Sequence, residues 1–123
     1  MAPDPTADRD ALLARARAWA DDDPDPDSER LVRGLVDAAS GDPGGEAEQE
    51  LTELFRAGLA FGTAGLRGPV GPGPGAMNRA VVRRAAAGVV AWVQGFVGAD
   101  GGVAVARDAR HGSDALLAEV VAV

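Results

Sequence analysis

Two short loops of the sequence combine glycine with charged residues, a composition suited to binding an anion. FGTAGLRG spans residues 61–68 and contains Arg67, whereas DARHGS spans residues 108–113 and contains Arg110 and His111. Glycine lets backbone N–H groups approach an anion closely, and the planar guanidinium of arginine matches the oxygens of a phosphate. The two loops therefore indicate a phosphate-handling site.

Each of these residues also has an ordinary structural interpretation. The glycines of the first loop can serve as turn residues, and Arg67 can be a solvent-exposed surface cation. His111 can be a loop residue that makes local hydrogen bonds. Neither a Walker loop nor a GxGxxG pattern is present. The residues by themselves leave both interpretations open.

Composition excludes several kinds of site. The chain has 123 residues and no cysteine, which rules out disulfides and thiolate metal sites, and one histidine cannot form a multi-histidine site. Residues 1–55 carry 15 acidic residues and 5 arginines, whereas residues 56–123 carry 4 acidic residues and 7 arginines. The acidic half argues against nonspecific binding of nucleic acid. The basic half would suit a small anionic ligand.

The sequence also predicts a cytoplasmic protein with no membrane partner. The N-terminus, Met-Ala-Pro-Asp, has no apolar h-region of a secretory signal. Glycine and arginine interrupt the longest apolar run, so no segment is expected to approach the length of a membrane span.

The first half of the chain reads as helical. Apolar residues at helical spacing predict helices over residues 8–20, 29–39 and 46–57. Between the first two, DDDPDPD (residues 21–27) is interpreted as a solvated connector, because proline and aspartate favour turns. Ser28 is expected to be the N-cap of the second helix.

The second half changes character. A short strand is expected at residues 59–63, followed by a glycine- and proline-rich loop and by a helix that Asn78 caps. A buried strand is expected at residues 102–108, and a last helix follows, with Ser113 more suited to be its N-cap than a nucleophile. The buried stripe expected on the helix after Asn78 comprises Val82, Ala86, Val89, Val93 and Phe96. This order predicts a βαβ unit of an open α/β sheet, in which ligand loops follow the carboxyl ends of strands.

Three segments in this order resemble the first domain of the α-D-phosphohexomutases, the family of phosphoglucomutase and phosphomannomutase. They are FGTAGLRG, NRAVVRRAAAG (residues 78–88) and ARDARHGSDA (residues 106–115). The resemblance implies a three-layer α/β/α fold around a mixed sheet. It places a helical segment at residues 1–57 and the start of domain I at residues 58–123. Because the last expected helix has no C-cap, we expect an N-terminal fragment of a longer protein.

The resemblance also implies a reaction. The family interconverts hexose 1-phosphates and hexose 6-phosphates through an active-site phosphoserine, with Mg²⁺ beside it. By this resemblance Arg67 is a catalytic residue near the phosphoserine, and Thr63, Gly65 and Gly68 shape its loop. Arg110 and His111 belong to a second loop near the substrate cleft.

Two departures from the family pattern matter. Relatives often read NRMN where this chain has Gly75-Ala76-Met77-Asn78. The serine motif TASHNP and the metal loop DGDxDR are absent, so the fragment is expected to have no metal ligands and no activity without the remaining domains of the parent chain. The alternatives are a noncatalytic remnant that binds a sugar phosphate or a partner chain, and an unrelated α/β nucleotide-binding domain.

Overall fold

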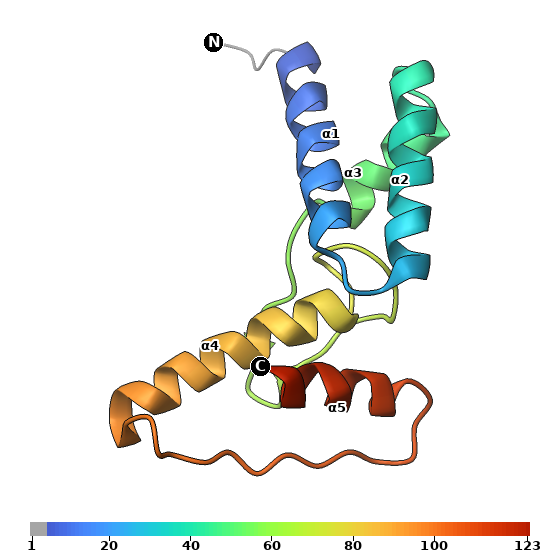
Figure 1. Cartoon of the computed structure of the whole chain (residues 1–123). Helices are drawn as coiled ribbons and strands as arrows, with labels where there is room; N and C mark the ends of the chain where they lie inside the picture. Colours follow the sequence, from blue (N-terminus) through green and yellow to red (C-terminus); the bar gives the residue numbers. More distant parts are fainter. Residues whose placement is uncertain (1–4) are drawn as a thin grey trace. The chain divides into compact units, whose positions relative to one another are not determined.

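The computed structural model describes residues 5–123, and the chain forms two compact units, residues 1–77 and 78–123. The first unit holds three helices and a small hairpin, and the second holds two helices (Figure 1). The elements are α1 (Pro5–Asp22), α2 (Pro26–Gly41), α3 (Glu46–Leu54), β1 (Phe61–Gly62), β2 (Gly65–Leu66), α4 (Arg79–Val97) and α5 (Ser113–Ala122).

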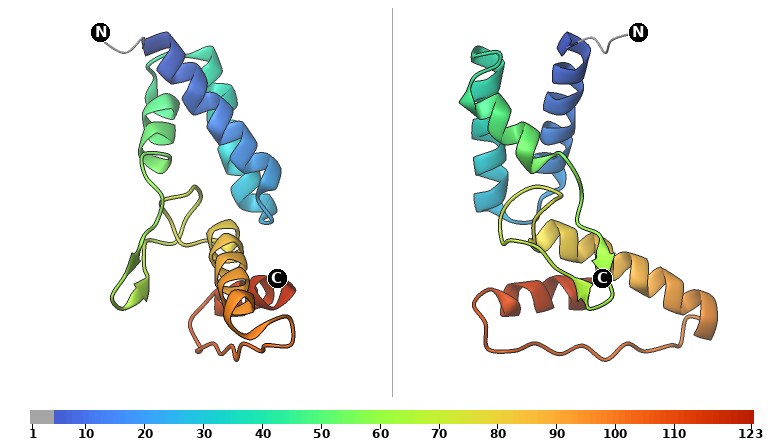
Figure 2. Two further views of the ribbon diagram at one scale, coloured as in Figure 1. Left: turned by 90° about the vertical axis from the view of Figure 1, so that its left-hand side faces the viewer. Right: turned by 180° about the vertical axis from the view of Figure 1, so that it is seen from behind.

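The first unit is built around the contact of α1, α2 and α3, which lie beside one another in both views of Figure 2. The three helices expected in this half are confirmed, although the third ends at Leu54. Trp19 of α1 meets Phe55 edge-to-face, with ring centroids 6.1 Å apart. The buried apolar residues of these helices are Leu13, Ala16, Trp19, Ala20, Val32, Val36, Ala39 and Leu51.

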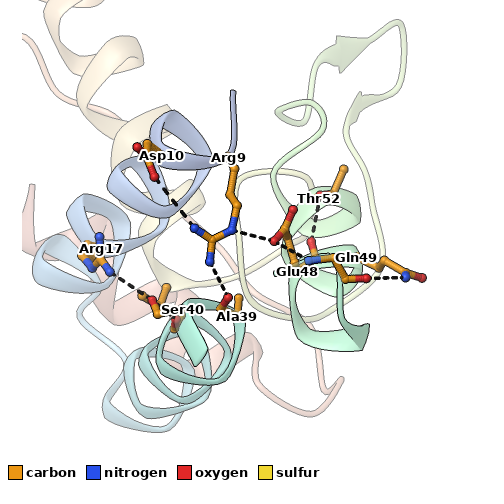
Figure 3. Close-up of polar contacts among 10 residues, drawn as sticks. Arg9, Asp10, Arg17, Ala39, Ser40, Glu48, Gln49 and Thr52 are labelled. Atoms are coloured by element: carbon orange, nitrogen blue, oxygen red, sulfur yellow. Dashed lines mark hydrogen bonds and ion pairs between the residues drawn. The ribbon is translucent and has the colours of Figure 1, made fainter. Parts of the chain in front are cut away.

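Arginine side chains tie the three helices together at their polar edge (Figure 3). Arg9 donates from Nε to Glu48 Oε2 at 2.9 Å and from Nη2 to the Ala39 carbonyl at 2.7 Å. The Gly44 backbone N–H lowers the pKa of the Glu48 carboxyl, partial burial opposes this, and Arg9 lowers it further. One guanidinium of α1 therefore contacts both α2 and α3.

The acidic connector between α1 and α2 is not simply solvated, so that interpretation is wrong for Asp23. This side chain is only 9% exposed. It accepts hydrogen bonds from Trp19 Nε1 at 3.2 Å, Ser28 Oγ at 2.5 Å and the Asp25 backbone N–H at 3.0 Å. A carboxylate can be buried here because three donors satisfy its oxygens.

Asp25, rather than Ser28, is the N-cap of α2. Its carboxylate accepts hydrogen bonds from the backbone N–H groups of Asp27 and Ser28. Pro26 is the first helical residue, a position that proline favours because the N–H it lacks would have no partner there. The helix thus begins earlier than the apolar pattern suggested.

In the second unit the N-cap of α4 is confirmed. Asn78 Oδ1 accepts a hydrogen bond from the Val81 backbone N–H at 2.9 Å. Ser113 is not a cap, because α5 begins at this residue and Gly112 precedes it with a φ of +82°. The Ser113 hydroxyl instead donates to the carbonyls of Asp108 and Arg110.

The expected apolar stripe of α4 is buried only in part. Ala86 is buried, and Val82 and Val93 are half-buried. Val89 and Phe96, by contrast, are 44% and 74% exposed. The stripe is covered where α5 packs against it, and the rest of it faces solvent within this unit.

The buried strand expected at residues 102–108 does not form. These residues are exposed and irregular, and no backbone group of residues 102–107 pairs with another described residue. A strand requires a neighbour for its ladder. The expected βαβ unit is therefore absent from residues 5–123, and the sheet that does form is the β1–β2 pair.

The expectation about membrane spans also needs correction. Within the described residues, α4 is long and apolar enough to cross a membrane by length and composition, with a mean hydropathy of 1.3. One such helix does not by itself show a membrane protein, since core helices of soluble proteins meet the same criterion.

The described residues contain both helices and strands, as expected for an α/β protein, and helices predominate.

We expect Asp23→Ala to lower the free energy of unfolding of the first unit by about 2 kcal/mol, because it leaves the Trp19 indole N–H and Ser28 without their acceptor. Urea unfolding followed by the amide NMR signals of α1 and α2 measures this. Asp37→Ala, at an exposed site on α2, is the matched control. Equal effects of the two substitutions would contradict the role given to Asp23.

Candidate functional site

The first candidate loop forms a tight β-hairpin. β1 and β2 pair antiparallel, with Phe61 opposite Leu66 and Gly62 opposite Gly65. Thr63 lies exposed in the turn between the strands. Gly65 has a φ of +103°, a conformation that residues with a Cβ rarely adopt. The backbone of the hairpin therefore requires glycine at position 65.

Arg67 directly follows this hairpin, and its side chain is available for a ligand. The residue is exposed, and it has no hydrogen-bond or ion-pair partner among residues 5–123. Gly68, next to it, packs closely: a Cβ there would lie 2.5 Å from Leu59 Cδ2. The backbone before Arg67 is thus held by the hairpin, and the position after it leaves little room for a side chain.

The glycine- and proline-rich segment after the hairpin is a packed structural loop. The Leu59 backbone N–H donates to the Pro74 carbonyl at 2.9 Å. A Cβ on Gly75 would lie 2.8 Å from the Ala57 carbonyl oxygen, and Ala76 is only 6% exposed. Gly75 and Ala76 therefore lie where the close packing of the loop favours small residues.

The second candidate loop is organised by Asp108. Its carboxylate accepts hydrogen bonds from the Arg110 backbone N–H at 3.1 Å and from Arg110 Nε at 2.8 Å. The Arg110 backbone N–H lowers the pKa of Asp108, partial burial opposes this, and the Arg110 guanidinium lowers it further. His111 lies exposed in the turn that follows. Arg110 thus already has a carboxylate partner, unlike Arg67.

The predicted site residues are divided between the two units. Thr63, Gly65, Arg67 and Gly68 lie on the hairpin of the first unit. Arg110 and His111 lie in the loop of the second unit. Each set is gathered locally, and their assignment to one site remains a prediction.

A comparison with protein-family models identifies the family of this chain. Residues 58–123, more than half of the chain, match the model described as phosphoglucomutase/phosphomannomutase, alpha/beta/alpha domain I. The chain belongs to this family. No curated protein and no solved structure gives a significant match to the chain.

Membership of the phosphoglucomutase/phosphomannomutase family confirms the resemblance seen in FGTAGLRG and ARDARHGSDA, because both segments lie within the matched residues. The match identifies residues 58–123 as part of a phosphohexomutase-type domain and assigns the chain to a family of mutases.

A buried carboxylate in this family domain escaped the sequence analysis. Glu119 of α5 is only 3% exposed. Arg79 donates to its Oε1, with Nε at 2.6 Å, and Arg83 donates to its Oε2, with Nε at 2.8 Å. The two arginines are four residues apart on α4, so they lie on one helical face. In the sequence, this spacing of two arginines and the single acidic residue within the apolar run LLAEVVA of α5 could have indicated the buried ion pairs.

The environment of Glu119 favours its charged form. Burial raises the pKa of the carboxyl, but the hydrogen bonds and charges of Arg79 and Arg83 outweigh it and lower the pKa below the ordinary value. Both carboxylate oxygens are satisfied by charge-assisted hydrogen bonds. The arrangement joins α4 to α5.

The described residues contain no ready-made cluster of metal ligands. Among residues 5–123, no group of three or more His, Asp or Glu side chains is arranged to hold a metal ion. Mg²⁺ is commonly held by one or two carboxylates together with water and substrate phosphates. The Mg²⁺ that the family resemblance implies therefore stays a prediction.

We expect acid to weaken the contact between α4 and α5. Because folding lowers the Glu119 pKa, its contribution to stability is complete above the unfolded-state value of about 4.3 and is lost as pH falls through the folded-state value. Amide hydrogen exchange of α5 can be followed by NMR from neutral pH to below the unfolded-state pKa. The protection of the α5 amides should decrease as the pH falls.

Glu119→Gln should reduce that protection at neutral pH and remove most of its pH dependence. The matched control is Asp114→Asn, which changes an exposed carboxylate on the same helix. An acid response that persists unchanged in Glu119→Gln would contradict the assignment to Glu119.

Proposed function

We propose that this chain supplies the arginine loop of a phospho-sugar mutase that interconverts hexose 1-phosphate and hexose 6-phosphate. The observation that carries the proposal is the position of Arg67 in the FGTAGLRG segment. Its guanidinium is exposed and has no partner among residues 5–123, and the residue directly follows the β1–β2 hairpin. Family membership through residues 58–123 supports the mutase class.

In this proposal Arg67 binds phosphate oxygens. A guanidinium can donate two parallel hydrogen bonds to a phosphate, which fixes orientation as well as position. The hairpin limits the freedom of the backbone at Arg67, so less entropy is lost when a phosphate binds. Phosphoryl transfer depends chiefly on positioning and electrostatic stabilisation, and a fixed cation next to the phosphate contributes to both.

Arg110 and His111 have a secondary role in the proposal. Arg110 is paired with Asp108, and its side chain is 87% exposed. An exposed ion pair is worth little, so a phosphate could take over the guanidinium at small cost. His111 lies next to it in the same turn and would contribute a hydrogen bond.

The remaining parts of the reaction are assigned to residues outside this sequence. TASHNP and DGDxDR do not occur in the 123 residues, so the phosphoserine and the Mg²⁺ ligands would come from the rest of a parent chain. The complete three-layer α/β/α domain with its mixed sheet is part of the same proposal.

We expect Arg67→Gln to weaken binding of glucose 1-phosphate or mannose 1-phosphate to the chain about tenfold, which corresponds to one lost charge-assisted hydrogen bond. Titration calorimetry on the purified chain measures this. The control is Arg56→Gln, which removes an exposed arginine that pairs with Glu53. Equal affinities of the Arg67 and Arg56 variants would remove the central support for the proposal.

We also expect the purified chain to convert no glucose 1-phosphate to glucose 6-phosphate. Phosphorus NMR of the reaction mixture, with Mg²⁺ and a glucose bisphosphate primer present, tests this. Conversion would show that a phosphoryl acceptor lies within the 123 residues. Binding without conversion fits both the mutase part and a noncatalytic sugar-phosphate remnant, and restored conversion on addition of the remaining domains would favour the former.

A further inference from the structure

The side chain of Ser113 holds the backbone of the second candidate loop. Its hydroxyl oxygen lies 2.8 Å from the Asp108 carbonyl oxygen and 2.8 Å from the Arg110 carbonyl oxygen. The Ser113 backbone N–H donates to the Arg110 carbonyl as well, at 3.2 Å. One serine therefore contacts the backbone at both ends of the segment from Asp108 to Arg110. Because these contacts all join residues 108–113, the loop is specified by its own residues.

The same contacts fix Arg110 at three points. Its backbone N–H donates to Asp108 Oδ1 at 3.1 Å, and its Nε donates to Asp108 Oδ2 at 2.8 Å. Its carbonyl accepts from Ser113. A guanidinium whose backbone and side chain are both anchored loses less entropy when it binds an anion. The loop is thus organised around the one residue in it that carries a permanent positive charge.

Ser113 also connects this loop to a docked helix. It is the first residue of α5, and Glu119 of the same helix is buried against Arg79 and Arg83 of α4. The position of the Ser113 hydroxyl is therefore set by a helix that is itself held in place. A mobile serine could not restrain the loop in this way.

We propose that Ser113 is a positioning residue, which holds Arg110 and His111 in the geometry that binds the phosphate of a hexose phosphate. This inference rests on the role given to Arg110 and His111 in the proposed function. Ser113 acts through the loop and not on the ligand, because a serine hydroxyl has a single hydrogen to donate and the two loop carbonyls share it.

The same contacts argue against two other roles for Ser113. A serine nucleophile needs a base that takes its proton, and the acceptors of this hydroxyl are backbone carbonyls. A helix N-cap accepts hydrogen bonds from backbone N–H groups inside the helix, but here the hydroxyl donates away from α5 to the preceding loop.

His111 gives a direct reading of the loop, because it is the only histidine of the chain. Its imidazole proton signals can be followed by NMR while glucose 1-phosphate is added to the purified chain. We expect the signals to move on binding, and Ser113→Ala to weaken the affinity read from them about fivefold, as expected for one lost hydrogen bond. Ser113→Thr keeps the hydroxyl and should restore the affinity to within about twofold.

Ser40→Ala is the matched control. The Ser40 hydroxyl also donates to a backbone carbonyl, that of Val36 at 2.7 Å, but it lies on α2 in the first unit. This substitution should leave the His111 titration unchanged. Amide hydrogen exchange of α5 in Ser113→Ala should match that of the unmodified chain, which shows that the helix remains docked.

The outcomes separate this inference from the proposed function. Equal affinities of the Ser113→Ala and unmodified chains would overturn the positioning role, as would a Ser113→Thr chain that binds no better than Ser113→Ala. His111 signals that do not move, while binding that depends on Arg67 persists, would overturn the role of Ser113 and leave the mutase proposal standing. If the chain bound no sugar phosphate at all, both would fall.

Discussion

The second unit depends on the burial of one carboxylate between two arginines. Glu119 would be costly to bury alone, but Arg79 and Arg83 satisfy both of its oxygens. This contact docks the ten residues of α5, which would be marginal as an isolated helix. The loop with Arg110 and His111 precedes α5 directly, so its geometry depends on the same contact.

The first unit uses a related solution in a different place. Asp23 lies in the connector between α1 and α2 and is buried there, where Trp19, Ser28 and the backbone supply its donors. In both units the hydrogen bonds of a buried carboxylate connect two helices: Asp23 accepts from residues of α1 and α2, and Glu119 of α5 accepts from two arginines of α4. Removal of one partner is costly in such an arrangement, since a buried polar group is left unsatisfied.

The arginines of the chain serve different purposes. Arg9, Arg79 and Arg83 join helices, and Arg110 stabilises a loop. Arg67 makes no such contact with residues 5–123, although a hairpin fixes the backbone before it. Arginine is strongly charged and has five donors. A positioned but unengaged guanidinium is therefore the feature best suited to an anionic ligand.

The sequence by itself determined the features that rest on local interactions. Helix hydrogen bonds join residues four apart, so apolar spacing and the Asn78 cap were enough to predict the helices. The FGTAGLRG segment likewise indicated the family from a short stretch of sequence, and the match to the family model confirms the family. Features that need a distant partner could not be read in this way.

Only the tertiary structure decided the burial of Glu119, because its two donors lie on α4, 36 to 40 residues away. The donors to Asp23 lie within five residues of it, but they are brought together by the packing of α1 against α2. The tertiary structure also decided against the strand at residues 102–108, since the alternating valines and alanines specify an extended chain but not the neighbour that a ladder requires. Local pattern sets the conformation that a segment prefers, and non-local pairing determines whether that conformation becomes part of a sheet or a buried core.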